Sequence, residues 1–282
     1  MTSFKNKLIT KASGQRTFFD EGKLRFSLKK SGADARTVDL AVEHVKSRFY
    51  EGISTGEIYH LAYTFLRDKV QDYHAAKYKL KNAIMELGPS GFPFEKFVAA
   101  LLNHQGFETL VSVILQGKCV SHEIDVVARH TNQLALVECK YHNNRGTLTD
   151  VKVPLYINSR FEDVRAVQAS LPENEGKELR GWLVTNTHFS EDAITYGNCA
   201  GLQLVGWDYP TGGSLKEQID TSGLYPITCL TTLTKSEKIE LLDKNIVLCK
   251  ELSATPVHLS GIGIIKSRIR KILTEATHLS GK

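Results

Sequence analysis

The stretch HEIDVVARHTNQLALVECKY, residues 122–141, decides the fold of this chain. Apolar residues fill most of its two halves, which are separated by the polar letters HTN. The halves are therefore predicted to form two β-strands, 122–129 and 133–141, joined across a polar turn. Pairing of these strands brings a small set of charged side chains together.

Three charged residues of the strand pair have the chemistry of a metal site. Successive side chains of a strand face opposite sides, so Glu138 and Lys140 share one face, and Asp125 can join them from the neighbouring strand. A hard cation such as Mg²⁺ or Mn²⁺ prefers oxygen ligands and is often held by one or two carboxylates with water and phosphate. A lysine beside it can stabilise charge that develops on a phosphate. The same letters also fit a hairpin whose charges face solvent, so the surrounding sequence has to decide.

The flanking segments favour the metal site. Upstream, GFPFEKFVAALLNHQGF at 91–107 has apolar residues at helical spacing with Glu95 near its start, and TLVSVIL at 109–115 predicts a strand. Downstream, GWLVTNTHFSEDAITYGNCAGLQLVGWDYP at 181–210 predicts a strand, a helix and a strand. In this order, residues 89–210 resemble the catalytic core of Mrr-type restriction endonucleases in the PD-(D/E)XK nuclease superfamily.

This resemblance implies an α/β fold with a central mixed β-sheet flanked by helices, and the activity of an endonuclease that depends on Mg²⁺ or Mn²⁺. By position, Asp125 and Glu138 would hold the metal, Lys140 would be the catalytic lysine and Glu95 would complete the site directly or through water. A plain solvated acid in the first helical turn is the equal alternative for Glu95. Many relatives have a small residue or glycine before the acid of the second strand, where this chain has SHEID, and Glu123 is expected to be an exposed edge acid.

Basic residues follow the strand pair and also concentrate toward both ends of the chain. Four cations after the lysine could contact phosphates, although surface cations seldom have so specific a role: His142, Arg145, Lys152 and Arg160. Residues 1–88 carry 16 Lys and Arg against 10 Asp and Glu, residues 89–214 carry 10 against 14, and residues 215–282 carry 10 against 7. Contact with a polyanion is therefore expected partly on the flanks.

Length and composition set the class of protein. At 282 residues the chain is long enough for two or three domains, and 41% hydrophobic with 24% charged residues is ordinary for a globular protein. No run of eighteen apolar residues and no apolar signal core occur, so neither a membrane span nor export is indicated. The 5 cysteines are scattered without CxxC spacing. They predict reduced thiols in a cytoplasm, with Cys139 as a core residue of its strand.

The amino-terminal segment predicts a small α+β domain. LITKASGQRTFF at 8–19 predicts two short strands around a turn, and Asp20 is expected to start a helix that stops at Gly32. A second helix is predicted over 37–50, and a third is predicted to begin at 54–55. ITKASG followed by FDEGKL and then GISTGEIY resembles the ATP-cone, a nucleotide-binding module of ribonucleotide reductases and their repressor.

The ATP-cone resemblance implies a nucleotide effector, ATP or dATP. It assigns Lys11 and Lys23 to the phosphates, Ile9 and Leu24 to the base, and Thr55 and Tyr59 to the pocket wall. One departure is that Ala12 stands where the family usually has a second basic residue. The alternative is a small mixed domain used for association, with both lysines solvated.

The carboxy-terminal segment LSGIGIIKSRIRKIL, 259–273, has a Gly-apolar-Gly turn before a basic, apolar-periodic helix. A glycine turn and a helix N-terminus can approach a phosphate closely. The segment resembles a helix-hairpin-helix element, which binds the DNA backbone without sequence preference. That resemblance assigns the turn to Gly261 and Gly263 and the cationic rim to Lys266, Arg268 and Arg270. A plain helical hairpin with glycine caps is the competing interpretation.

These segments predict three domains: 1–88, an ATP-cone; 89–212, the nuclease core; and 213–282, a helical DNA-binding domain. The whole is predicted to be a cytoplasmic homo-oligomer, dimer or higher, that cleaves double-stranded DNA in restriction or phage defence under control of ATP or dATP. Two alternatives share the sequence features: a nucleotide-sensing DNA-binding regulator without cleavage, and a structure-specific repair or junction nuclease. Retention of Lys140 favours an enzyme, because a scaffold has no need of that lysine.

Overall fold

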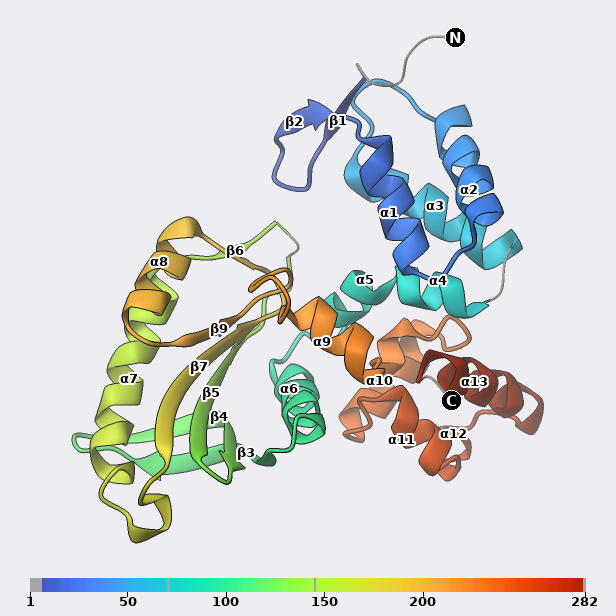
Figure 1. Ribbon diagram of the computed structural model, residues 1–282. Helices are drawn as coiled ribbons and strands as arrows, with labels where there is room; N and C mark the ends of the chain where they lie inside the picture. Colours follow the sequence, from blue (N-terminus) through green and yellow to red (C-terminus); the bar gives the residue numbers. More distant parts are fainter. Residues whose placement is uncertain (1–6, 70–71, 145, 281–282) are drawn as a thin grey trace. The chain divides into compact units, whose positions relative to one another are not determined.

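The computed structural model describes residues 7–69, 72–144 and 146–280, and the chain forms two compact units (Figure 1). One unit is 84–224 and contains the quoted strand pair, and the other combines the two ends of the chain, 1–83 and 225–282. The division into three functional domains with boundaries near 88 and 212 stays a prediction.

A five-stranded mixed sheet is the centre of unit 84–224, with strand order β3-β4-β5-β7-β9. The first three strands pair antiparallel, whereas β5, β7 and β9 pair parallel. The strands are β3 (Glu108–Gln116), β4 (Ser121–His130), β5 (Gln133–Lys140), β7 (Glu178–Thr185) and β9 (Gln203–Val205). A second, short parallel sheet joins β6 (Leu148–Thr149) to β8 (His188–Phe189). The predicted strand pair and the predicted fold class are confirmed.

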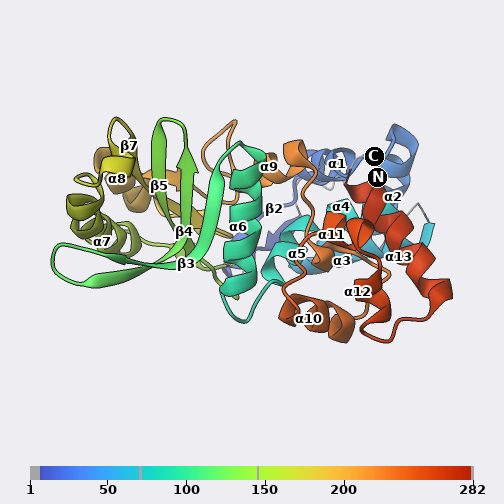
Figure 2. The same ribbon diagram turned by 90° about the horizontal axis from the view of Figure 1, so that it is seen from below.

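Helices cover both faces of the sheet (Figures 1 and 2). One face is covered by α6 (Phe92–His104), which packs on β3, β4 and β5. The other is covered by α7 (Lys152–Gln168) and α8 (Glu191–Cys199). The short helices η2 (Pro172–Asn174) and α9 (Leu215–Ser222) complete the unit. The sheet core is thus a three-layered arrangement in which α6 and α7 bound the central strands.

Burial of apolar side chains on both sides of the central strands explains this arrangement. The letters LALV of β5 are all buried, and α7 adds Phe161 and Val164 to the same cluster as Leu134 and Leu136. Gly181 of β7 lets this helix approach, because a Cβ there would lie 2.8 Å from Leu202 and 3.0 Å from Phe161. The close packing fixes α7, and with it the side chains that α7 directs toward the end of β5.

The pairing of β3 with β4 is interrupted at one level. Ser112 has φ of 53°, a left-handed conformation that is uncommon for a residue other than glycine. Val111 pairs with Val126 and Val113 with Ile124, but the intervening Ser112 and its neighbour across the strands, Asp125, form no ladder pair. Ile124 and Val127, which are three positions apart in β4, both belong to one core cluster.

The amino-terminal half of the other unit begins with the hairpin of β1 (Leu8–Thr10) and β2 (Arg16–Phe18). The helices α1 (Glu21–Lys30), α2 (Ala35–Ser47), α3 (Thr55–Lys69) and α4 (Asp72–Tyr78) follow, and α5 (Leu80–Met85) leads across the boundary between the units. Asp20 and Asp34 cap α1 and α2 by accepting backbone N–H bonds. The predicted order of two short strands and three helices is observed.

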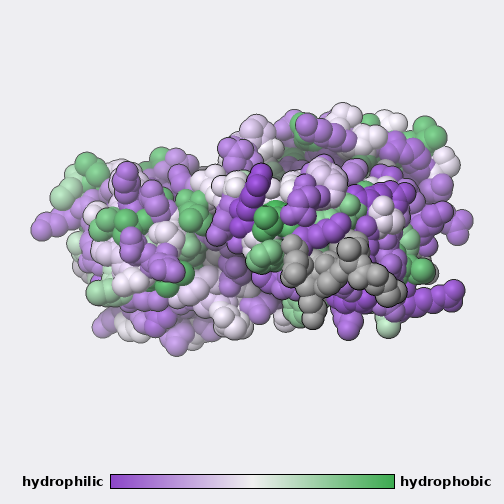
Figure 3. All heavy atoms as spheres, turned by 90° about the horizontal axis from the view of Figure 1, so that it is seen from above, coloured by the Kyte–Doolittle hydropathy of each residue, from purple (hydrophilic) through white to green (hydrophobic). Residues whose placement is uncertain are grey.

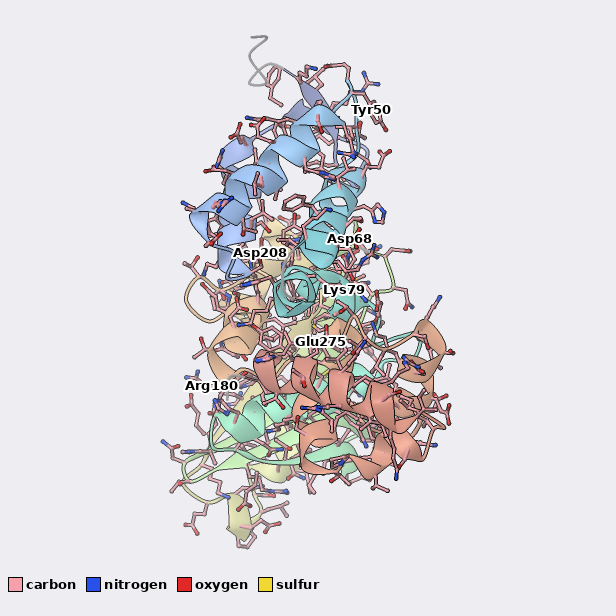
Figure 4. The ribbon with its side chains drawn as sticks, turned by 90° about the vertical axis from the view of Figure 1, so that its right-hand side faces the viewer. Tyr50, Asp68, Lys79, Arg180, Asp208 and Glu275 are labelled. Atoms are coloured by element: carbon pink, nitrogen blue, oxygen red, sulfur yellow. The ribbon has the colours of Figure 1, made fainter. Side chains whose placement is uncertain are left out.

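The carboxy-terminal half of this unit is helical and packs on the amino-terminal half. Its helices are η3 (Ile227–Cys229), α10 (Lys235–Asp243), α11 (Cys249–Ala254), α12 (Val257–Ser260) and α13 (Lys266–Leu279). Thr228 joins the halves: its carbonyl accepts from Lys79 Nζ at 3.1 Å and Lys238 Nζ at 3.0 Å, and its hydroxyl donates to the Ala83 carbonyl at 2.7 Å. Figure 4 labels Lys79 and, on α13, the buried Glu275.

Glu275 is satisfied by four donors although it is buried. The backbone N–H and the hydroxyl of Thr231 and Thr232 donate to its carboxylate at 2.6 to 3.0 Å. A buried charge with such partners is tolerated because its hydrogen bonds replace those to water. The contact anchors α13 to the loop before α10.

The surface is mostly polar on the face that Figure 3 shows, with hydrophobic side chains in small groups. No helix among the described residues is long and apolar enough to span a membrane. All five cysteines are free thiols, and Cys139 is buried in the sheet, as the sequence predicted.

Candidate active site

Asp125 and Glu138 meet where β4 and β5 begin to pair. Val126 pairs with Val137, and the Asp125 carboxylate accepts a hydrogen bond from the Cys139 backbone N–H at 2.7 Å. This bond holds the carboxylate beside β5, between Glu138 and Lys140. The side chain of Lys140 is exposed at the end of β5, two residues beyond Glu138.

The two carboxylates influence one another electrostatically. Burial first, and then the charge of Asp125, raise the pKa of Glu138 to about 7, while Arg160 and Lys140 oppose the shift. Burial also raises the pKa of Asp125, against the Cys139 N–H and the charge of Arg160. The site therefore holds negative charge that a cation would relieve.

Glu95 of α6 belongs to the same charged group. It lies in the first turn of the helix, and its carboxylate accepts from the Ser112 hydroxyl at 3.4 Å. Burial first, and then the charges of Asp125 and Glu123, raise the pKa of Glu95 to about 7. This geometry favours Glu95 as a member of the site over a freely solvated acid, and its role in catalysis stays a prediction. Glu123 is exposed, as expected.

Arg160 of α7 contacts the site, a partnership that its position in the sequence did not reveal. Its Nη1 lies 2.8 Å from Glu138 Oε2, and its Nη2 donates to the backbone carbonyl of Glu123. Its guanidinium carbon lies 5.5 Å from the centre of the Tyr156 ring. The sequence indicated Arg160 only as a possible phosphate contact, because its pairing with Glu138 depends on how α7 packs on the sheet.

A second residue of α7 fixes the tip of the β3–β4 hairpin. Asp163 accepts from the backbone N–H of Cys119 at 2.8 Å and Val120 at 3.3 Å, and lies 2.8 Å from His122 Nε2. The bond to His122 is the largest cause that holds the pKa of the Asp163 carboxyl far below its usual range. One helix thus ties the hairpin tip and the candidate site together.

The other basic residues predicted near the phosphates differ in their surroundings. His142 is partly buried: its Nε2 lies 3.0 Å from Thr149 Oγ1, its backbone N–H donates to Asn186 Oδ1 at 2.8 Å, and burial lowers the pKa of its imidazole. Lys152 is exposed at the start of α7. Arg145 lies outside the described residues.

The donors at the site fit a hard divalent cation with partial protein ligation. Among residues 7–69, 72–144 and 146–280, no three His, Cys, Asp or Glu side chains are arranged to hold a metal ion by themselves. Asp125 and Glu138 nevertheless offer two neighbouring carboxylates whose repulsion a cation would remove. Magnesium commonly takes one or two carboxylates and fills its remaining positions with water and phosphate.

The six residues assigned to nucleotide binding lie in the amino-terminal half of the other unit. Lys11 and Lys23 are exposed, with Lys11 Nζ 3.0 Å from Gln15 Oε1 and Lys23 Nζ 4.0 Å from Asp20. Ile9 and Leu24 are buried in the hydrophobic core, Thr55 is the first residue of α3, and Tyr59 stacks on Tyr63 and Tyr78 with ring centres 6.0 and 5.2 Å apart. Their role in binding nucleotide stays a prediction.

The residues assigned to the helix-hairpin-helix lie in the turn from α12 into α13. Gly263 has φ of 79°, as a tight turn requires, but the amides of Gly261 and Gly263 already donate to the carbonyls of Val257 and Ser260 at 2.9 and 3.0 Å. Arg268 pairs with Glu237 at 2.5 and 3.0 Å. These bonds are those of a capped helical hairpin, and the cations left exposed are Lys266 and Arg270.

Fold and site together define a restriction-endonuclease type of domain. Residues 88–208 match the family model Mrr_cat, restriction endonuclease, which confirms the resemblance predicted for 89–210. Residues 225–280 match a second model, the AF1548-like C-terminal family. The resemblance of the amino-terminal segment to an ATP-cone stays a prediction.

Two relatives define the family more narrowly. An uncharacterised protein of Archaeoglobus fulgidus is 37% identical over 185 residues, which are 65% of this chain and 100% of that protein. The crystal structure of "Protein of Unknown Function AF1548" matches with 36% identity and a TM-score of 0.56, covering 68% of this chain and 99% of that chain. This chain belongs to the AF1548-like family.

Proposed function

We propose that this protein is a Mg²⁺-dependent or Mn²⁺-dependent DNA endonuclease that hydrolyses phosphodiester bonds in restriction or phage defence. One observation carries the proposal: the carboxylates of Asp125 and Glu138 lie together at a partly buried point between adjacent strands, with Lys140 near enough to act on the charge of Glu138. The restriction-endonuclease domain around that point supports double-stranded DNA as the substrate.

The residues of the chain divide the work of hydrolysis. A bound divalent ion would polarise the phosphodiester and lower the pKa of an attacking water. Asp125 and Glu138 would hold that ion, and the Cys139 N–H would keep the Asp125 carboxylate in place. Lys140 would orient the water or stabilise the charge that grows on the phosphate oxygens. Glu95 would complete the site from α6, with Ser112 fixing its carboxylate.

A plasmid nicking assay with Mg²⁺ tests the proposal. The parent is expected to lose supercoiled DNA, and Asp125→Ala and Lys140→Ala are expected to do so at least tenfold more slowly, which is about 1.4 kcal/mol of barrier. Asp125→Asn is the matched control for folding, because its amide oxygen can still accept from the Cys139 N–H. Equal rates in parent and variants would remove the proposed site.

Regulation by ATP or dATP is a second part of the proposal. It is supported by the order of strands and helices in residues 7–69 and by the exposure of Lys11 and Lys23, which leaves both ammonium groups accessible to phosphates. We expect either nucleotide to change the cleavage rate or the size of a homo-oligomer. Equal rates and equal mass by light scattering with and without nucleotide would remove this part and leave the nuclease untouched.

The two other functions are distinguished by substrate. A nucleotide-sensing regulator would bind DNA tightly without cleaving it in Mg²⁺ or Mn²⁺. A repair or junction nuclease would prefer branched DNA to linear duplex, whether methylated or not. The charged group of Glu95, Asp125 and Glu138 favours cleavage, since repelling buried carboxylates are costly in a domain that only binds.

A further inference from the structure

Arg160 occupies an unusual place for a helix arginine. Its side chain is only 16% exposed, and it bridges two strands by contacting the Glu138 carboxylate and the Glu123 backbone carbonyl. Tyr156, whose ring lies beside the guanidinium of Arg160, is 63% exposed. Arg160 is therefore held between a proposed metal ligand and an open aromatic surface.

The contact with Glu138 gives the charged group a cation without any metal. Arg160 opposes the shifts that burial imposes on both Glu138 and Asp125. A guanidinium with two hydrogen-bonded partners is a well-defined counter-ion for a partly buried carboxylate. In the metal-free protein, Arg160 therefore stabilises the site in the folded state.

A divalent ion and Arg160 compete for the same carboxylate. Two cations beside Glu138 repel one another, and a carboxylate that accepts from a guanidinium offers less of its charge to a metal. Binding of an ion by Asp125 and Glu138 is thus expected to weaken the contact with Arg160. The guanidinium would remain next to Tyr156, where its planar donors suit the oxygens of a phosphate.

We infer that Arg160 is an exchangeable counter-ion, which pairs with Glu138 in the metal-free protein and turns to a phosphate of the bound DNA once the metal is in place. This inference rests on the proposed nuclease function. It assigns to Arg160 two successive partners, Glu138 and the substrate, and predicts opposite effects of its removal on metal binding and on cleavage.

The test compares Arg160→Met with Arg165→Met, a control on the same helix whose arginine pairs with Glu162 at 3.2 Å and lies over Phe161. Binding of Mn²⁺ is measured by calorimetry without DNA at about pH 8.5, where carboxylates are ionised. Single-turnover cleavage of a duplex is measured at saturating Mn²⁺. Thermal unfolding checks that each variant is folded.

Arg160→Met is expected to bind Mn²⁺ about threefold more tightly or better and to cleave about tenfold more slowly or worse, while Arg165→Met matches the parent in both. Unchanged or weaker Mn²⁺ binding by Arg160→Met would overturn the inference, as would an unchanged cleavage rate. If Arg160→Met does not fold, Arg160→Gln, which also removes the charge but keeps a polar side chain, takes its place with the same expected directions, and parent-like values for both measurements would overturn the inference.

A different result would contradict the proposed nuclease function: no cleavage of DNA by the parent protein. The exchange of Arg160 at Glu138 is tested independently, by the Mn²⁺ titration of the protein without DNA.

Discussion

At the scale of single residues, the acids of the candidate site have an unusual state of protonation. Glu95 and Glu138 each have a pKa of about 7 in the folded protein, against an ordinary value of 4.5. Between these pH values the folded protein binds more protons than the unfolded chain does. Its stability therefore falls as the pH rises, and the loss is complete above about pH 7.

Glu95→Gln is expected to remove part of this loss. Its amide oxygen can still accept from the Ser112 hydroxyl, so the variant should exceed the parent in free energy of unfolding by about 1 to 2 kcal/mol at pH 8 and match it near pH 4.5. Urea unfolding followed by tryptophan fluorescence measures this, because both tryptophans, Trp182 and Trp207, lie in unit 84–224. Equal stability at pH 8 would contradict the explanation.

The positions of Asp125, Glu138 and Lys140 could be predicted from strand periodicity and from the resemblance to a nuclease family. The pairing of Arg160 with Glu138 could not, because it depends on the packing of α7 against β4 and β5. The bond from Ser112 to Glu95 was equally hidden, since it needs a left-handed residue within a strand. The periodicity of apolar residues predicts only regular strands and helices, and Ser112 has an irregular backbone conformation.

At the scale of elements, Ser112 places a left-handed residue within β3 and donates to Glu95 of α6. A residue with φ of 53° is strained if its side chain is β-branched. Ser112→Val should lower the free energy of unfolding by about 1 to 3 kcal/mol. Ser112→Gly should adopt the left-handed backbone conformation without strain, but it should lose the hydrogen bond to Glu95.

Urea unfolding and the nicking assay distinguish these effects. Ser112→Val is expected to be impaired in both stability and cleavage, since valine is strained at this φ and cannot donate to Glu95. If Ser112→Val were as stable as Ser112→Gly, the left-handed conformation would have no energetic importance.

The helix α13 carries both an ion-paired arginine and exposed basic residues. Arg268 is bound to Glu237, and this pairing holds the pKa of the Glu237 carboxyl at about 2, whereas Lys266 and Arg270 are exposed. Lys266→Ala with Arg270→Ala should weaken binding to duplex DNA and reduce its salt dependence by about one or two phosphate contacts. Arg268→Met should chiefly lower stability.

Fluorescence anisotropy across a salt series measures the affinities. Equal loss of affinity in Arg268→Met and in the double variant would show that the pairing with Glu237 does not keep Arg268 from DNA. The sign of the stability effect follows from the lowered pKa of Glu237: the contribution of the pair is present above about pH 4.5 and is lost as the pH falls toward 2.

At the scale of the whole molecule, many of the strands and helices followed from local sequence, but α7 and the union of the two chain ends did not. Lys79 and Thr228 are in contact although they are far apart in sequence, and no local pattern announces such a pair. Each unit has its own hydrophobic core, so separate unfolding transitions are expected.

Thr228→Val tests this independence. It removes the hydroxyl that donates to the Ala83 carbonyl and leaves that carbonyl without its partner, at a cost of about 1 to 3 kcal/mol to the unit of the chain ends. Circular dichroism should report an earlier helical transition, while the tryptophan transition of unit 84–224 stays where it was. A matched shift of both transitions would mean that the units unfold together.

The unit of the chain ends is interrupted in sequence by unit 84–224, and this order affects how the protein folds during its synthesis. A nascent chain emerges from its amino terminus, and domains generally fold as units during translation. The central unit is continuous and can close while residues 225–282 are still being made, whereas the unit of the two ends has to wait for its last helices. In every newly made molecule, the proposed cleavage site is therefore expected to mature before the part proposed to sense nucleotide.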